Sequence, residues 1–152
     1  MPPLDKPAPA WAAELLAAAR VGRLATADGA GRPLVVPVCY AFDGTWLYSA
    51  VDAKPKRTRE LRRLRNVAEN AYVSLVVDEY DEDWTRLRYV IVEGRADVLH
   101  EGDDFAGAID LLAAKYAQYR TLLPLSRDAG TVLRIAPTRI LTWRFAGTGI
   151  AG

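Results

Sequence analysis

The chain concentrates positive charge at one point, in the residues that follow a predicted strand at Trp46–Val51. Lys54, Lys56 and Arg57 come just before Thr58, which we expect to cap the N terminus of a short helix. The free backbone N–H groups and the dipole at a helix start favour a bound anion, and neighbouring cations strengthen that preference. The segment therefore predicts a phosphate-binding site.

The same basic segment is also compatible with a solvated surface or with a nucleic-acid site. Arg59, Arg62 and Arg63 fall on the helix side away from Leu61 and Leu64, where charged residues commonly form a solvated face. A basic helix can also bind nucleic acid. However, the formal net charge of the whole chain is only +1 and no other segment is comparably basic. This distribution favours a small anionic ligand and argues against a nucleic-acid partner.

Few other residues could do chemistry. The chain has one cysteine, Cys39, in an apolar strand pattern, and one histidine, His100, at a predicted strand end. We therefore expect no internal disulfide, no structural zinc site and no metal-binding site of another kind. The sequence also has no Gly-x-Ser-x-Gly elbow and no phosphate-cradling glycine-rich loop. Any reaction must depend on a bound cofactor.

At 152 residues the chain fits a single domain, residues 1–152, with flexible tails expected at 1–8 and 147–152. No apolar run approaches the ~20 residues of a membrane helix, and the N terminus lacks the apolar core of a signal peptide. We expect a cytoplasmic protein that does not bind membranes.

Periodicity predicts strands separated by short turns and a few helices. Asp43-Gly44 is a strong hairpin signal, Pro37 is expected to bend its strand, and Gly94 to mark a β-bulge. Helices are expected at 11–20, 58–70 and 103–116, and strands at 23–27, 33–42, 46–51, 72–77, 88–99, 131–135 and 139–145, the last two as a pair separated by Ala136-Pro137. Antiparallel neighbours with closed edges make a small β-barrel with peripheral helices the simplest architecture.

The order of short motifs resembles the split β-barrel flavin and deazaflavin oxidoreductases related to pyridoxamine 5′-phosphate oxidase. The matching pieces run from Arg23 to Trp143 and are Leu24-Ala25-Thr26, Pro33 to Val38, Asp43-Gly44, Lys54-x-Lys56-Arg57, Asn70-x-x-Val73-Ser74, Glu93-Gly94-x-Ala96 and Pro137-x-Arg139. The Arg-x-His ending of pyridoxal-phosphate-making oxidases is replaced by Trp143-Arg144-Phe145, which argues against that particular activity. The basic segment and the loop Asp81–Trp84 are most similar to the actinobacterial subgroup that uses coenzyme F420.

The resemblance implies a mainly β fold, a six-stranded antiparallel split β-barrel of the FMN-binding type, which works as a homodimer with the cofactor between subunits. It implies F420 as cofactor, with FMN as the alternative, and hydride transfer to a small conjugated substrate. A non-catalytic deazaflavin carrier, or a module that binds another phosphorylated ligand, is the third possibility. The cofactor-binding residues expected on this basis are Val36, Pro37, Val38, Tyr48, Ser49 and Ala50 for the ring, Lys54, Lys56 and Arg57 for the phosphate, Arg59, Arg62 and Arg63 for an anionic tail, and Trp84 for the substrate side. Tyr80 is the one candidate proton donor.

Overall fold

The computed structural model describes the backbone of residues 6–51, 57–146 and 149–151, and the side chains of residues 6–51 and 62–146. The elements are α1 (Ala10–Ala18), β1 (Gly22–Ala27), β2 (Pro33–Val38), β3 (Ala41–Phe42), β4 (Leu47–Val51), α2 (Arg57–Glu69), β5 (Tyr72–Glu79), the 3₁₀ turn η1 (Trp84–Arg86), β6 (Arg88–Leu99), α3 (Asp103–Lys115), the 3₁₀ turn η2 (Ala117–Tyr119), β7 (Thr131–Ala146) and β8 (Gly149–Ala151). Among the described residues, no helix is long and apolar enough to cross a bilayer.

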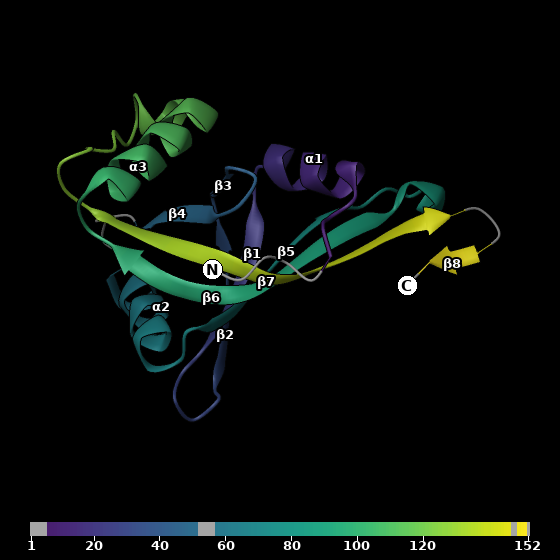
Figure 1. Cartoon of the computed structure of the whole chain (residues 1–152), viewed down its shortest axis with the longest axis horizontal. Coiled ribbons are helices and arrows are strands. Elements are labelled where there is room, and N and C mark those ends of the chain that lie inside the picture. The colour runs from purple at the N-terminus through teal and green to yellow at the C-terminus, as the bar shows by residue number, and fades with distance from the viewer. Residues whose placement is uncertain (1–5, 52–56, 147–148, 152) are drawn as a thin grey trace.

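All strands belong to one antiparallel sheet in the order β2-β1-β5-β6-β7-β4-β3, with β8 added to β7 (Figure 1). The first and last strands of this order, β2 and β3, are neighbours in sequence and are separated only by Cys39 and Tyr40. The sheet therefore curls so that its two edge strands come together, joined by these two residues. With β2 and β3 counted as one interrupted strand, the sheet has the six strands that we expected and one more, the short β8, so the strand count differs slightly while the fold class of an antiparallel split β-barrel is confirmed.

The interruption at Cys39 and Tyr40, which we call the strand break, corrects one prediction. We expected a single strand from residue 33 to 42, bent at Pro37. Instead, β2 pairs with β1, with Val38 opposite Gly22, and β3 pairs with β4, with Ala41 opposite Tyr48. The hairpin signal at Asp43-Gly44 is confirmed: Gly44 has a φ of 97°, and the hairpin joins β3 to β4.

The strands predicted at 131–135 and 139–145 are one continuous strand, β7, so the expected pair is wrong. Pro137 does not end β7 because it lies opposite Gly94, where the β6–β7 register shifts, and the expected bulge at Gly94 is confirmed. A Cβ atom on Gly94 would lie 2.5 Å from the carbonyl oxygen of Ala136, so the two strands approach too closely there for any side chain. In the stretch expected to be a tail, residues 149–151 form β8.

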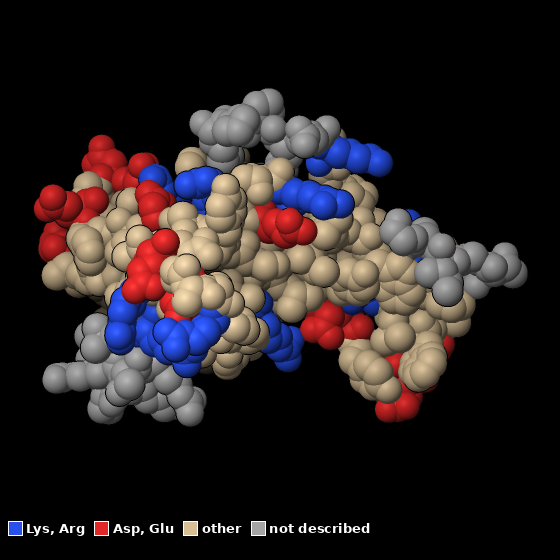
Figure 2. Space-filling view, turned by 90° about the horizontal axis from the view of Figure 1, so that it is seen from below, with Lys and Arg blue, Asp and Glu red and all other residues tan. Residues whose placement is uncertain are grey.

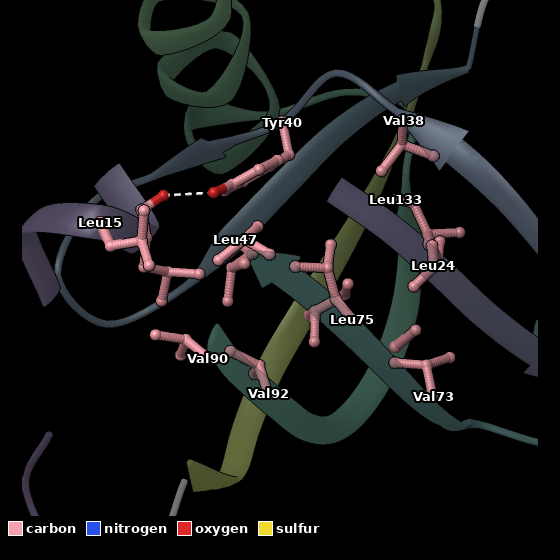
Figure 3. Close-up of a cluster of buried hydrophobic side chains, with 14 of the residues drawn as sticks. Leu15, Leu24, Val38, Tyr40, Leu47, Val73, Leu75, Val90, Val92 and Leu133 are labelled. Atoms are coloured by element: carbon pink, nitrogen blue, oxygen red, sulfur yellow. Dashed lines mark hydrogen bonds between the residues drawn. The ribbon is translucent and has the colours of Figure 1, made fainter. Parts of the chain in front are cut away.

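Alternate residues of the strands point into the main hydrophobic core (Figure 3), and a second buried cluster lies between α3 and the strands β3, β4 and β7. Leu24, Leu75, Val92 and Leu133 are each 1% exposed or less and come from four different strands. Tyr40 enters this core from the strand break, and its hydroxyl donates to the carbonyl oxygen of Leu16 in α1. Helices α1 and α3 lie on one side of the sheet in Figure 1, and α2 lies on the other.

Candidate functional site

The two ends of the sheet leave backbone edges without a strand partner among the described residues. Strand β2 pairs with β1 on one edge only, and β3 pairs with β4 only at Leu47 and Tyr48. The β4 edge at Ser49–Val51 thus has β7 on one side and no strand on the other. We call the region between these two edges the split. The Ser49 hydroxyl donates to the Cys39 carbonyl oxygen over 2.9 Å, which places β4 directly beside the end of β2.

The residues predicted to hold a flat ring lie on these edges. Along β2, Val36 is half-buried, Pro37 is exposed and Val38 is buried. Along β4, Ser49 is buried at the split, whereas Tyr48 and Ala50 pack against the core beneath α3. The structure therefore brings both predicted groups together, but Tyr48 and Ala50 can offer a ligand only their backbone atoms.

The Tyr48 side chain is engaged in the fold. Its hydroxyl donates to Oδ2 of Asp43 over 3.2 Å, and burial raises the pKa of Tyr48 to about 12. A phenol with this pKa stays protonated at neutral pH. Its position beneath α3 makes it part of the packing that holds β4.

Helix α2 packs against β1 through Asn66 and lies beside β2 through Arg62. It begins at Arg57, so Thr58 lies inside the helix and is not the N-cap that we predicted. Lys54 and Lys56 lie outside the described residues, as do the side chains of Arg57 and Arg59. A buried hydrogen bond joins the second half of the helix to β1: Nδ2 of Asn66 donates to Oγ1 of Thr26 over 3.0 Å, with both side chains buried.

Two arginines of α2 face solvent beside the β1–β2 hairpin. Arg62 and Arg65 are exposed, and Nη2 of Arg62 makes a long contact of 3.5 Å with the carbonyl oxygen of Pro33 in β2. They line a polar cavity of about 420 Å³ together with Asp28, Arg32, Asn66 and Glu69. Figure 2 shows that Lys and Arg side chains gather on this underside of the molecule.

Arg63 does not belong to this cationic surface. We expected it beside Arg59 and Arg62 on the solvated face, but it is only 8% exposed. The prediction is wrong because the apolar stripe of α2 is wider than Leu61 and Leu64 indicated: Val67 and Asn66 are also buried, and Arg63 lies four residues before Val67 on the same face. Arg65, which we did not predict, takes its place, and its spacing of three from Arg62 is the signal that could have identified it.

The charges in the cavity leave a net positive surface. Asp28 is neutralised by Arg32, with Nε of Arg32 2.8 Å from Oδ2, and backbone N–H groups together with this arginine lower the pKa of Asp28. The carboxylate of Glu69 accepts the N–H of Gly29 over 2.8 Å. Among the described residues, no carboxylate forms an ion pair with Arg62 or Arg65. These two guanidinium groups remain available to an anionic ligand.

Trp84 and Tyr80 lie elsewhere in the chain. They are 64% and 67% exposed on the loop between β5 and β6. This loop lies beside the C-terminal end of β7, where the N–H of Phe145 donates to the carbonyl oxygen of Leu87, and in Figure 1 that end is far from α2. The structure does not bring either aromatic residue to the split of the same chain.

No group of three His, Cys, Asp or Glu side chains is arranged to hold a metal ion within the described part of the chain. The observed site thus consists of exposed strand edges and arginines without an acid–base pair. Such a site can bind and orient a flat anionic molecule, and the reactive atoms must belong to that molecule.

Comparison with known proteins agrees with this geometry. The family model described as pyridoxamine 5′-phosphate oxidase matches residues 9–144. A 5a,11a-dehydrotetracycline/5a,11a-dehydrooxytetracycline reductase from Streptomyces rimosus is 31% identical over 127 residues, which is 83% of this chain and 75% of that protein.

Two solved structures share the fold. An F420 reductase superposes with a TM-score of 0.63 and 26% identity, covering 88% of this chain and 98% of that one. A FAD-binding protein from Mesorhizobium loti superposes with a TM-score of 0.64 and 27% identity, covering 89% and 94%. The chain therefore belongs to the pyridoxamine 5′-phosphate oxidase family of oxidoreductases, as the order of its motifs predicted.

Proposed function

We propose that this protein is an F420-dependent reductase that transfers a hydride from the reduced deazaflavin to a small conjugated organic substrate. The observation that carries the proposal is the position of Arg62 and Arg65 on α2, beside the unpaired edge of β2. An anionic tail held by these arginines would leave a flat ring at the split. The 31% identity to a reductase of 5a,11a-dehydrotetracycline supports both the reaction type and a conjugated substrate.

The charge of the site favours F420 over FMN as the cofactor. FMN ends at its phosphate, whereas F420 continues beyond the phosphate with a tail that carries further carboxylates. Lys54, Lys56 and Arg57 lie closest in sequence to the split and suit the phosphate. Arg62 and Arg65 lie one to two helical turns further along α2, where only the longer tail has charge to offer.

The protein's own residues would bind and orient rather than react. Backbone groups along β2 and along Ser49–Val51 would pair with the polar edge of the ring, while the basic segment fixes how far the ring enters the split. When bound, F420 supplies the hydride, the electron-poor double bond of the substrate accepts it, and solvent supplies the proton. An acid–base pair in the protein is then not needed.

A homodimer would complete the site. One face of the sheet carries an apolar row across the three neighbouring strands β5, β6 and β7, formed by the half-buried Val76, Ile91 and Leu141, and Val35 on β2 is 61% exposed. A second copy on this face would bury these side chains. It could also bring the loop with Trp84 and Tyr80 to the partner's split, which they do not reach in their own chain.

Fluorescence titration of the purified protein with F420, and separately with FMN, tests the proposal. We expect the protein to bind F420 more tightly than FMN. The double variant Arg62→Ala with Arg65→Ala should lower the affinity for F420 at least tenfold and change the affinity for FMN less than threefold. Arg120→Ala combined with Arg127→Ala removes the same charge from exposed residues away from α2 and should change neither affinity.

The outcomes separate the candidate functions. An FMN-dependent oxidoreductase on the same fold would be favoured by either of two results. One is an equal loss of affinity for both cofactors in the arginine variant, and the other is tighter binding of FMN than of F420 by the wild-type protein. F420 binding without oxidation of the reduced form by quinones, enones or tetrapyrroles would favour a carrier. Binding of neither cofactor would contradict the proposal.

A further inference from the structure

A pocket lies at the point where the β4 edge ends. It has a volume of about 300 Å³, and its floor is formed by Ala50 and Val51 of β4 and by Ile109 of α3. Its wall is the loop between η2 and β7, which returns to the sheet at Thr131, directly opposite Val51. We call this space the apolar pocket, because most of the side chains that line it are aliphatic.

The wall of the apolar pocket is attached at both of its ends. The backbone N–H groups of Leu123 and Leu125 donate to carbonyl oxygens of η2 over 2.8 and 3.0 Å. Further along the loop, Nε of Arg127 lies 3.1 Å from Oδ1 of Asp110 in α3. These contacts hold the loop against α3, so the pocket is formed before any ligand binds, as is usual for small-molecule sites.

The lining of the apolar pocket suits an uncharged molecule. Leu123 and Leu125 are half-buried and Ile109 is 4% exposed, whereas Leu122 at the rim is 72% exposed. Among the described residues, no charged side chain lines this pocket, while the cavity beside α2 is lined by charges of both signs. A charged group in the apolar pocket would lose hydration without gaining a partner, so the lining favours an apolar ligand.

The apolar pocket adjoins the place where we propose that the cofactor ring binds. Ala50 and Val51 line the pocket, and they also belong to the β4 edge at Ser49–Val51, whose backbone groups would pair with the polar edge of that ring. A molecule in the pocket would therefore lie beside the ring. The volume is at the lower end of the range for small-molecule sites, roughly 300–1,000 Å³, which favours a compact substrate.

We infer that the apolar pocket binds the uncharged ring system of a compact substrate beside the cofactor ring, and that Leu122 at its rim selects against charged substrates. This inference rests on the function proposed above. The pocket offers a substrate apolar contact and the two hydroxyl groups of Ser126 and Thr131. Its residues would thus orient the substrate and exclude water, and they would not react themselves.

The test places a charge at the rim of the pocket and the same charge at a matched control position. Leu122→Glu and Leu122→Arg change the rim, and Leu111→Glu and Leu111→Arg change a leucine of α3 that is 38% exposed and does not line the pocket. The uncharged probe is 2-methyl-1,4-naphthoquinone, which accepts the hydride of reduced F420 and one proton from solvent and becomes its hydroquinone, leaving the deazaflavin oxidised. The anionic probe, 9,10-anthraquinone-2-sulfonate, is reduced in the same way.

We expect Leu122→Glu to raise the KM for the naphthoquinone at least fivefold, while kcat and the affinity for F420 stay within twofold of the wild-type values. Leu122→Arg should have a KM for the sulfonate at least threefold lower than that of Leu122→Glu, because its charge attracts the anion. Both Leu111 variants should stay within twofold of wild type for both probes. Unchanged KM values in the Leu122 variants, or equal changes in the Leu111 variants, would overturn the inference.

A second measurement does not depend on turnover. The naphthoquinone is titrated into wild-type protein with ¹³C-labelled leucine and isoleucine methyl groups, with and without F420. We expect the methyl signals of Leu123, Leu125 and Ile109 to shift and those of Leu111 to stay in place, and absence of shifts at the pocket in both titrations would overturn the inference. Wild-type protein that binds neither F420 nor FMN would instead overturn the proposed function, while the methyl shifts would still decide whether the pocket takes an apolar molecule.

Discussion

Asn66 and Thr26 form a buried side-chain hydrogen bond that joins the basic helix to the barrel. Nδ2 of Asn66 lies 3.0 Å from Oγ1 of Thr26, and the two residues are 2% and 3% exposed. Asn66→Ala leaves the Thr26 hydroxyl without this partner, so we expect the free energy of unfolding to fall by about 1–3 kcal/mol. Urea denaturation measures the change, with the exposed neighbour Arg65→Ala as a control that should lie within about 0.5 kcal/mol of wild type. Equal stability of the two variants would show that the bond does not fasten α2.

Replacement of Lys54, Lys56 and Arg57 together by Ala should abolish cofactor binding. Hydrogen bonds from charged groups are each worth about 1.5–3 kcal/mol, so we expect F420 affinity to fall more than 100-fold. The melting temperature should change little, because solvated cations contribute little to stability. A triple variant of Lys6, Arg120 and Arg127 to Ala carries the same change in charge and should bind normally. If both triple variants bind F420 equally well, the phosphate site has been placed wrongly.

Replacement of Gly94 and of Gly107 by alanine should change the free energy of unfolding in opposite directions. At Gly94 the new methyl group would meet the carbonyl oxygen of Ala136 at 2.5 Å, so β6 or β7 must shift, at a cost of about 1–3 kcal/mol. At Gly107, inside α3, nothing lies within 4 Å, and alanine should stabilise the helix by about 0.5–1 kcal/mol. Thermal unfolding of the two variants checks both signs. A Gly94→Ala protein as stable as wild type would mean that the bulge tolerates a side chain.

Lys115 should make stability depend on pH above neutrality. Burial and the neighbouring Arg20 lower the pKa of Lys115 to about 8, whereas an unfolded lysine keeps its ordinary pKa of 10.5. Between these values the unfolded chain binds more protons than the folded protein, so this residue makes stability rise with pH. We expect the difference in unfolding free energy between wild type and Lys115→Met to move in favour of wild type from pH 7.5 to 9.5.

Urea denaturation at several pH values over this range measures the Lys115 effect. Buried tyrosines such as Tyr48, with its pKa raised to about 12, act in the opposite direction, but only as the pH approaches 10. Parallel pH profiles for the two proteins would contradict the expected effect.

Local signals in the sequence identified much of the fold. The turn at Asp43-Gly44 and the bulge at Gly94 are encoded by nearby residues and lie where expected, and the helix expected at 103–116 ends one residue earlier, at Lys115. The strand break was missed because Cys39 and Tyr40 have ordinary strand propensity. At the break the backbone of Tyr40 is bound by Lys115 and Tyr116, about 75 residues away in sequence, and such distant contacts cannot be read from local propensity.

The geometry of the candidate site was predictable to a similar degree, and its role in binding stays a prediction. Charge density alone identified α2 and its surroundings, and the family resemblance identified the edges of β2 and β4. Which arginines face the cavity was not predictable, because burial of Arg63 and exposure of Arg65 depend on how α2 packs on β1. The remote position of Trp84 likewise depends on the length of β6 and β7.

The prolines of β2 have a consequence for solubility. A bare strand edge is a template on which other polypeptides can add a strand and aggregate. Pro33 and Pro37 have no N–H group, and they alternate with Val35 along β2. A foreign strand would therefore find a single amide donor among these three positions, which lets the protein expose an open edge to a small molecule without recruiting other chains.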